Sequence, residues 1–175
     1  MAKPSDAHLP EVVSSSATIA KEFPSEHLSA VTFCLQTVGV SDSIPDNCNT
    51  KGFYSDLVRA FVKPDRVLRG RVTCLHTINP VVTNFYGSLH GGFVAADVAE
   101  TVSIACARSV VAEDKELSLG ELSISYLSSA PMNEEVIVDG SVGRSERNFT
   151  VVAVEFNMPS YELLWFRQIR IFVSV

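Results

Sequence analysis

The sequence predicts an α+β domain in which an antiparallel sheet of about five to six strands surrounds one long central helix. Residues 88–111 have the composition of a single helix. A β-rich run precedes this helix at 68–78, and further β-rich runs follow it, at 117–127, 135–142, 149–157 and 164–175. Because helices and strands do not alternate along the chain, a parallel α/β fold is not expected.

The predicted helix is apolar on nearly all of its faces. Between Phe93 and Ala112 most residues are Ala, Val, Ile, Cys or Ser. A helix of this kind is buried all round, as when a sheet wraps around it. Asp97, Glu100 and Ser103 follow one another at intervals of three residues and form a polar seam. We expect this seam to line a cleft or a subunit interface, since its neighbours are too apolar for a solvent-facing side.

The start of the chain differs in composition from the rest. A serine run and scattered prolines predict a poorly ordered or accessory leader over residues 1–50. Within it, residues 26–38 have the apolar spacing of a helix, and a short amphipathic helix around 53–61 ends before Pro64. Residues 51–175 are expected to form a single domain.

Composition restricts the class of protein. The formal net charge of −6 disfavours a nucleic-acid binder, and the most apolar stretch, 93–112, carries charged residues that exclude a membrane span. The mean hydropathy of +0.20 favours a homo-oligomer that buries additional apolar surface. The four cysteines lack the spacing of a metal site, and no secretory signal is visible, so we expect a cytoplasmic protein with reduced thiols and no metal.

The most informative motif stands just before the helix, where residues 84–92 read NFYGSLHGG. Glycines let a ligand approach the backbone closely. The first amides of a helix have no intrahelical acceptor and lie at its positive end. Together these features predict a site for an oxyanion or a polarised carbonyl.

A thioester suits such a site, because a thiolate leaves readily and needs little help from a general acid. A polarised carbonyl and one helix carboxylate, as base or nucleophile, are then sufficient for hydrolysis. No GxSxG nucleophile elbow, P-loop or dinucleotide-binding motif occurs in the sequence. The motif therefore favours a thioester hydrolase over those classes.

Residues from about 66 to 175 resemble the hotdog-fold acyl-CoA thioesterases, which include phenylacetyl-CoA, 4-hydroxybenzoyl-CoA and mammalian acyl-CoA thioesterase 13 enzymes; the plant members are the most similar. The resemblance rests on Asn84, Gly87, the LHGG run at 89–92, the AET run at 99–101 and the ELSISYLS run at 121–128. It implies a hotdog fold and an acyl-CoA substrate, with coenzyme A as part of the substrate and no separate cofactor. It also implies a homo-oligomer, a dimer or a dimer of dimers, with active sites between subunits.

The resemblance assigns roles to the residues of the motif. The amide of Gly91 would polarise the thioester carbonyl, with Gly92 beside it in the substrate site. His90 would support this part of the chain, and Asn84 would place the carbonyl or the attacking water.

The helix carboxylate is displaced from the family pattern. In the family it usually comes nine residues after the motif histidine, whereas Glu100 comes ten and Asp97 seven residues after it. An ungapped alignment puts Ala99 at the catalytic position and Ser103 at the family's Ser/Thr position, where it would orient water. A one-residue insertion aligns Glu100 but leaves Ile104 at the Ser/Thr position. A π-bulge would absorb the extra residue, and we favour Glu100 as base or nucleophile, then Asp97.

Two further groups are candidates for contact with the substrate. Arg144 and Arg147 lie in a turn between two predicted strands, where they would pair with the phosphates of coenzyme A or be ordinary hairpin charges. Tyr86, with Phe85 and Phe93, could line an acyl or aryl pocket. Two other functions stay open, a non-catalytic hotdog protein that binds acyl-CoA or serves in assembly and, less favoured, a hydratase or dehydratase.

Overall fold

The computed structural model describes residues 18–19, 25–38, 46, 52–112, 114–159 and 168–174. Most of the predicted leader, the start of the last predicted strand and Cys48 lie outside these ranges. Within them, no helix is both long enough and apolar enough to cross a bilayer.

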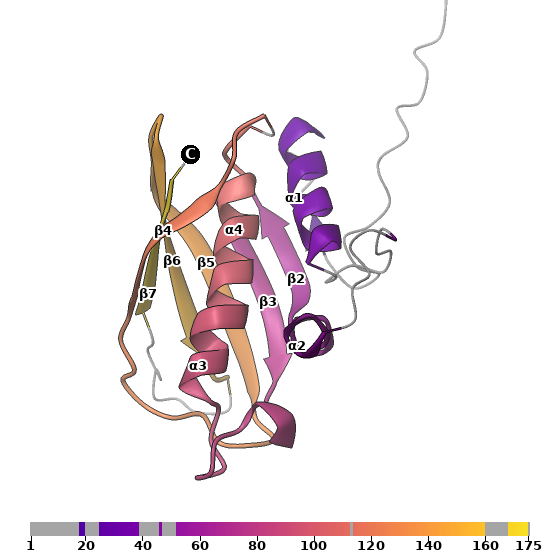
Figure 1. Ribbon diagram of the computed structural model, residues 1–175, viewed down its shortest axis with the longest axis vertical. Helices are drawn as coiled ribbons and strands as arrows, with labels where there is room; N and C mark the ends of the chain where they lie inside the picture. The colour runs from indigo at the N-terminus through magenta and orange to yellow at the C-terminus, as the bar shows by residue number, and fades with distance from the viewer. Residues whose placement is uncertain are drawn as a thin grey trace, which may run out of the picture.

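The framework is a curved seven-stranded sheet in the order β1-β2-β3-β5-β6-β7-β4. All neighbouring strands pair antiparallel except β1 and β2, which are parallel. Figure 1 shows the sheet behind the central helix. The strands are β1 (Thr18–Ile19), β2 (Lys63–Leu68), β3 (Arg71–Thr77), β4 (Ser118–Ile124), β5 (Glu135–Ser145), β6 (Phe149–Asn157) and β7 (Gln168–Ser174).

The central helix has three consecutive parts, α3 (Gly91–Phe93), a π-helical turn η2 (Val94–Ala99) and α4 (Glu100–Arg108). The prediction that this helix begins at Ser88 and continues to Val111 is therefore wrong at both ends. Ser88 and Leu89 instead form isolated β-bridges, which hold that part of the chain extended. A 3₁₀ turn η1 (Pro80–Val82) lies upstream.

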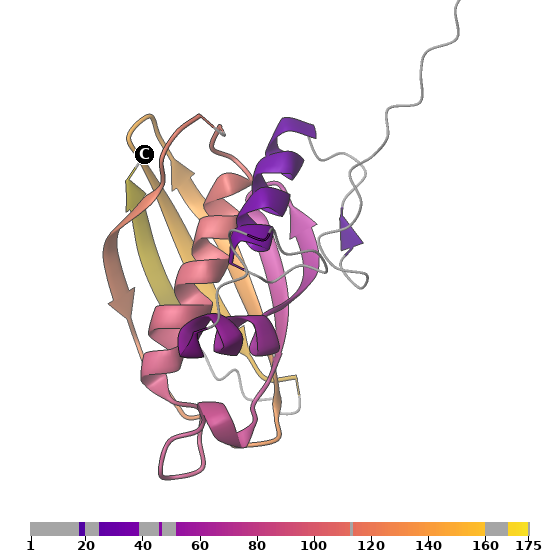
Figure 2. The ribbon, with the colours of Figure 1, turned by 45° about the vertical axis from the view of Figure 1, so that its right-hand side comes forward.

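Two further helices, α1 (Ser25–Thr37) and α2 (Phe53–Phe61), agree with the predicted segments. Both lie beside the central helix, on the same side of the sheet (Figures 1 and 2). Val31 and Leu35 of α1 are almost completely buried and belong to the same core as the central helix. The hydrophobic core thus extends across the expected boundary at residue 50.

The central helix packs closely against β5 at Gly140. A Cβ atom at this position would lie only 2.8 Å from Cγ1 of Val102. Val98, Val102 and Cys106 are at most 1% exposed, so the predicted burial of the helix against the sheet is confirmed. The absence of a side chain at Gly140 allows this close approach.

Strand β2 was not predicted. One strand was expected over 68–78, whereas the chain forms a β2–β3 hairpin that turns at Gly70, whose φ is +75°. Pro64 ended the helix in the prediction but lies inside β2, next to a register shift. Proline is tolerated at such irregular positions because it has no amide to donate to a neighbouring strand.

Candidate active site

The segment before the central helix, residues 84–92, forms a loop that we call the glycine loop. The side-chain Oδ1 of Asn84 accepts hydrogen bonds from Tyr86 N at 2.9 Å, from Ser88 N at 3.2 Å and from Ser88 Oγ at 3.1 Å. Gly87 between them has a φ of +72°, a conformation that favours glycine. The side-chain oxygen Oδ1 of Asn84 therefore holds the loop together. The side-chain nitrogen is then the part of Asn84 that is suited to contact a substrate.

The glycine loop is attached to the segment that follows β4. Leu89 N donates to Ala130 O at 2.8 Å, and Met132 N donates to Gly87 O at 3.1 Å. These main-chain bonds hold the loop against residues 126–132, far away in the sequence.

His90 is the N-cap of the central helix. Its Nδ1 accepts a hydrogen bond from Gly92 N at 3.0 Å, and its own N–H donates to Val82 O at 2.8 Å. The Gly92 amide is therefore occupied by the cap. Gly91 supplies the first amide of the helix, a position that has no intrahelical acceptor. The geometry thus favours Gly91 over Gly92 as the donor to a substrate carbonyl.

A residue that the sequence analysis did not select, Tyr126, lies on the other side of the glycine pair. Its hydroxyl donates to Gly91 O at 2.8 Å. A Cβ atom on Gly91 would lie 3.1 Å from Cε1 of Tyr126, and one on Gly92 would lie 3.0 Å from Cε1 of His90. Each glycine therefore makes room for one ring. Tyr126 lies in the ELSISYLS run, but its role could not be assigned from that run, because its contact with Gly91 spans 35 residues.

The π-helical turn η2 ends immediately before Glu100. The predicted absorption of an extra residue by a π-bulge is confirmed. Glu100 is half-buried and shares a stripe of α4 with Ile104 and Arg108, which are also half-buried and follow at intervals of four residues. Ser103 is completely buried, so the expected common seam of Glu100 and Ser103 is wrong. The backbone of Asp97 lies in η2, and its side chain is outside the described part of the structure.

The end of β5 and the turn to β6, which carry Arg144 and Arg147, lie at the far end of the central helix from the glycine loop (Figure 1). Arg144 Nε donates to Glu146 Oε1 at 2.7 Å, and Lys115, beyond the end of α4, donates to Arg147 O at 3.1 Å. The helix between the two ends is roughly 25 Å long at 1.5 Å per residue. One chain therefore does not bring these arginines to Gly91.

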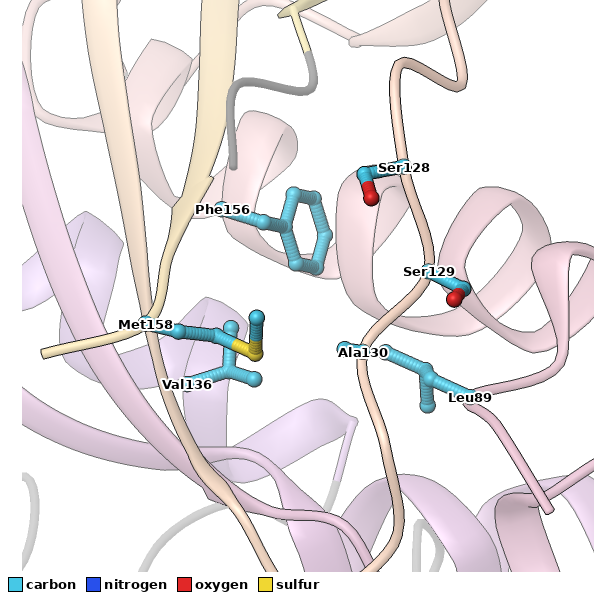
Figure 3. Close-up of a pocket in the computed structure, with 7 residues that line it drawn as sticks. All are labelled: Leu89, Ser128, Ser129, Ala130, Val136, Phe156 and Met158. Carbon is cyan, nitrogen blue, oxygen red and sulfur yellow. The ribbon is translucent and has the colours of Figure 1, made fainter. Parts of the chain in front are cut away.

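The aromatic residues of the glycine loop do not enclose a pocket within one chain. Phe85 and Tyr86 are 97% and 87% exposed, whereas Phe93 is buried with its ring 5.6 Å from that of His76. Behind the loop lies a cavity of about 10 Å³, shown in Figure 3. It has room for about one water molecule and not for an acyl group. Its lining consists of Leu89, Ser128, Ser129, Ala130, Val136, Phe156 and Met158.

Two of the cysteines in the described part of the chain, Cys74 and Cys106, are buried. Burial raises the pKa of Cys74 and Cys106 to about 12, so both thiols stay protonated near neutral pH. Among the described residues there is no group of three His, Cys, Asp or Glu side chains that could hold a metal ion.

A largely antiparallel sheet around a central helix, which here begins with a Gly-Gly pair, defines the hotdog class of fold. Residues 86–157 match the family model described as the thioesterase superfamily. Over these residues the chain is similar to that superfamily. No curated protein sequence matches the chain.

Solved structures of thioesterases have the same fold. Zebra fish thioesterase superfamily member 2 superposes with a TM-score of 0.64 and 21% identity, over 72% of this chain and 88% of that one. A mutant of the phenylacetic acid degradation protein PaaI from Thermus thermophilus gives 0.59 and 14%, over 68% and 97%. A Streptococcus mutans protein bound to acetyl CoA gives 0.53 and 20%, over 65% and 87%.

Proposed function

We propose that the protein is an acyl-CoA thioesterase, which hydrolyses a thioester to the free acid and coenzyme A. The observation that carries this proposal is the capped start of the central helix. There His90 occupies the Gly92 amide, and the preceding Gly91 amide is the first of the helix. A thioester oxygen that accepts from Gly91 N–H becomes more negative in the tetrahedral transition state, which this donor stabilises.

Glu100 is the proposed base or nucleophile. As a base it removes a proton from water, whose oxygen attacks the carbonyl carbon; as a nucleophile its carboxylate attacks directly and water then hydrolyses the anhydride. In both routes the carbon–sulfur bond breaks, and the thiolate of coenzyme A leaves and takes up a proton. No metal or cofactor is required.

We further propose that the working form is a homo-oligomer, a dimer or a dimer of dimers. Exposed apolar side chains gather on the glycine loop and the segment tied to it, namely Phe85, Tyr86, Tyr126, Leu127 and Met132. An antiparallel partner would cover this surface and bring its own Arg144 and Arg147 towards Gly91. Ser103 is completely buried within one chain and therefore does not face this interface.

The remaining parts of the proposal follow from composition and resemblance. The ligand is an acyl-CoA, in line with the acetyl-CoA-bound protein of similar fold. Neither nucleic acid nor a membrane is a proposed partner. The proposed compartment is the cytoplasm, which suits the free Cys34, Cys74 and Cys106. The similarity to plant members stays a prediction.

The test is a panel of acyl-CoA esters assayed with a thiol-reactive dye. We expect turnover by the wild type, a loss of about 100-fold or more in kcat for Glu100→Ala, and retained activity for the matched variant Asp97→Ala. The reverse pattern would assign the reaction to Asp97.

The alternative is a non-catalytic hotdog protein that binds acyl-CoA or serves in assembly. It is favoured by the displaced carboxylate, because the ungapped alignment with the family puts Ala99, and not Glu100, at the catalytic position. Binding of acyl-CoA by calorimetry without turnover across the panel would establish this alternative.

A further inference from the structure

We propose that Tyr126 is a positioning residue that, together with His90, fixes the orientation of the Gly91 amide. This inference rests on the proposed function, because the fixed amide is the donor to the thioester carbonyl. Tyr126 follows β4, outside the NFYGSLHGG motif and outside the helix.

The peptide unit between Gly91 and Gly92 is held at both of its polar atoms. On one side the Tyr126 hydroxyl donates to Gly91 O at 2.8 Å. On the other, Gly92 N–H donates to His90 Nδ1 at 3.0 Å. Because a peptide unit is planar, two hydrogen bonds at opposite atoms fix the orientation of its plane.

The peptide unit on the other side of Gly91 is also held. Its oxygen, His90 O, accepts from Val94 N at 3.2 Å. Both planes that flank the Gly91 Cα are thus restrained, and with them the direction of Gly91 N–H. Without such restraints a glycine has more backbone freedom than any other residue, and the donor would lose its alignment.

The Gly91 carbonyl also lies where the helix changes its hydrogen-bond pattern. It accepts from Val94 N at the end of α3, directly before the π-helical turn η2. A helix that leaves the i to i+4 pattern has less regular backbone bonding. An additional donor from outside the helix stabilises the carbonyl at this irregular point.

Packing of the Tyr126 ring on Gly91 helps to keep the hydroxyl in position for its hydrogen bond. The ring packs so closely on Gly91 that an added Cβ would lie 3.1 Å from Cε1 and 3.3 Å from Oη. The ring is 50% exposed, so its position is maintained by these contacts more than by burial. Tyr126→Phe keeps the ring and removes only the hydroxyl, which makes it the appropriate variant.

The experiment combines kinetics with glycine-selective ¹⁵N labelling of the full chain, which has nine glycines. In Tyr126→Phe we expect the Gly91 and Gly92 amide signals to shift and Gly92 to exchange its hydrogen about fivefold faster. With the best acyl-CoA ester we expect kcat to fall about three- to tenfold at an unchanged KM. The matched control is Thr37→Val on α1, which removes a hydroxyl-to-carbonyl bond of the same 2.8 Å length and should leave both readouts unchanged.

Each other result has a definite meaning. Unchanged Gly91 and Gly92 signals in Tyr126→Phe would overturn the proposed restraint, whatever the activity. Shifted signals with an unchanged kcat, or a raised KM alone, would overturn the positioning role. If the wild type hydrolyses no ester, the proposed function is wrong, and the glycine signals alone still decide whether Tyr126 holds this peptide.

Discussion

The two ends of the central helix are stabilised by different groups. At its start, side chains hold the backbone of the glycine loop, through Asn84 Oδ1, His90 Nδ1 and the Tyr126 hydroxyl. At its end, a cation satisfies carbonyl oxygens, since Arg108 Nη1 donates to Lys115 O at 2.6 Å. The first end supplies an amide donor, and the second end supplies positive charge.

This difference follows from the polarity of a helix, whose first amides and last carbonyls have no internal partners. The start therefore suits a carbonyl oxygen that becomes negative. The cations at the end are partly used by the fold itself, as in the pair of Arg144 with Glu146. A ligand that needs both features must reach along the length of the helix within one chain or meet the two ends on two chains that run antiparallel.

The largest expected effect is a loss of stability when the central helix is pushed away from the sheet, because this disturbs both ends of the helix. In Gly140→Ala the new Cβ would lie 2.8 Å from Val102 Cγ1. We expect a loss of about 2 kcal/mol or more in the free energy of unfolding and a Tm lowered by roughly 5 °C or more, measured by calorimetry. Gly143→Ala is the matched control in the same strand, because its nearest neighbour is 4.0 Å away. Equal Tm values for the two variants would contradict the close packing.

A substitution at the start of the helix should affect the proposed catalytic step without changing the other end of the helix. His90→Ala removes the acceptor of Gly92 N–H, and we expect kcat to fall about tenfold or more with about 1 kcal/mol lost in stability. His90→Asn should restore most of both, since asparagine is a good N-cap. If Asn fails to restore the stability, the ring has a role other than capping.

The smallest effect, a change in KM, is expected from the arginines near the C-terminal end of the central helix. Arg144→Gln with Arg147→Gln should raise the KM for acyl-CoA about fivefold at an unchanged kcat, because a phosphate contact contributes to binding only. The thioester of the same acid with N-acetylcysteamine, which has no phosphates, should be unaffected. Lys63→Gln, an exposed cation on β2, is the control. A loss of activity with both thioesters would show that these arginines act through the fold.

The elements that local patterns determine were predictable from the sequence. The strand at 149–157 alternates buried and half-buried residues along its whole length, and its predicted bounds agree with β6. The π-turn was also predicted, as the way to absorb one extra residue when Glu100 is aligned with the family's carboxylate. β2 was missed because Pro64 resembles a break, although the strand accommodates it at an irregular register.

The contacts of the candidate site were less predictable. The glycine motif is contiguous, so His90 and Gly91 could be selected from the sequence. Tyr126 could not, because its position against Gly91 depends on the pairing of residues 88 and 131 in the folded chain. The distance between Arg144 and Gly91 likewise depends on the direction of the strands.

The π-turn also has a consequence for the two halves of the helix. Adding one residue to a regular α-helix rotates all following side chains about the helix axis by about 100°. A wider π-helical turn absorbs the added residue, so the side chains before and after it keep their directions. The glycine loop therefore determines the rotation of α3 about the helix axis, and the sheet determines that of α4, independently of each other. Deleting one residue from η2 would fix the rotation of α4 relative to α3. Either the contacts of α3 with the glycine loop or those of α4 with the sheet would then be lost.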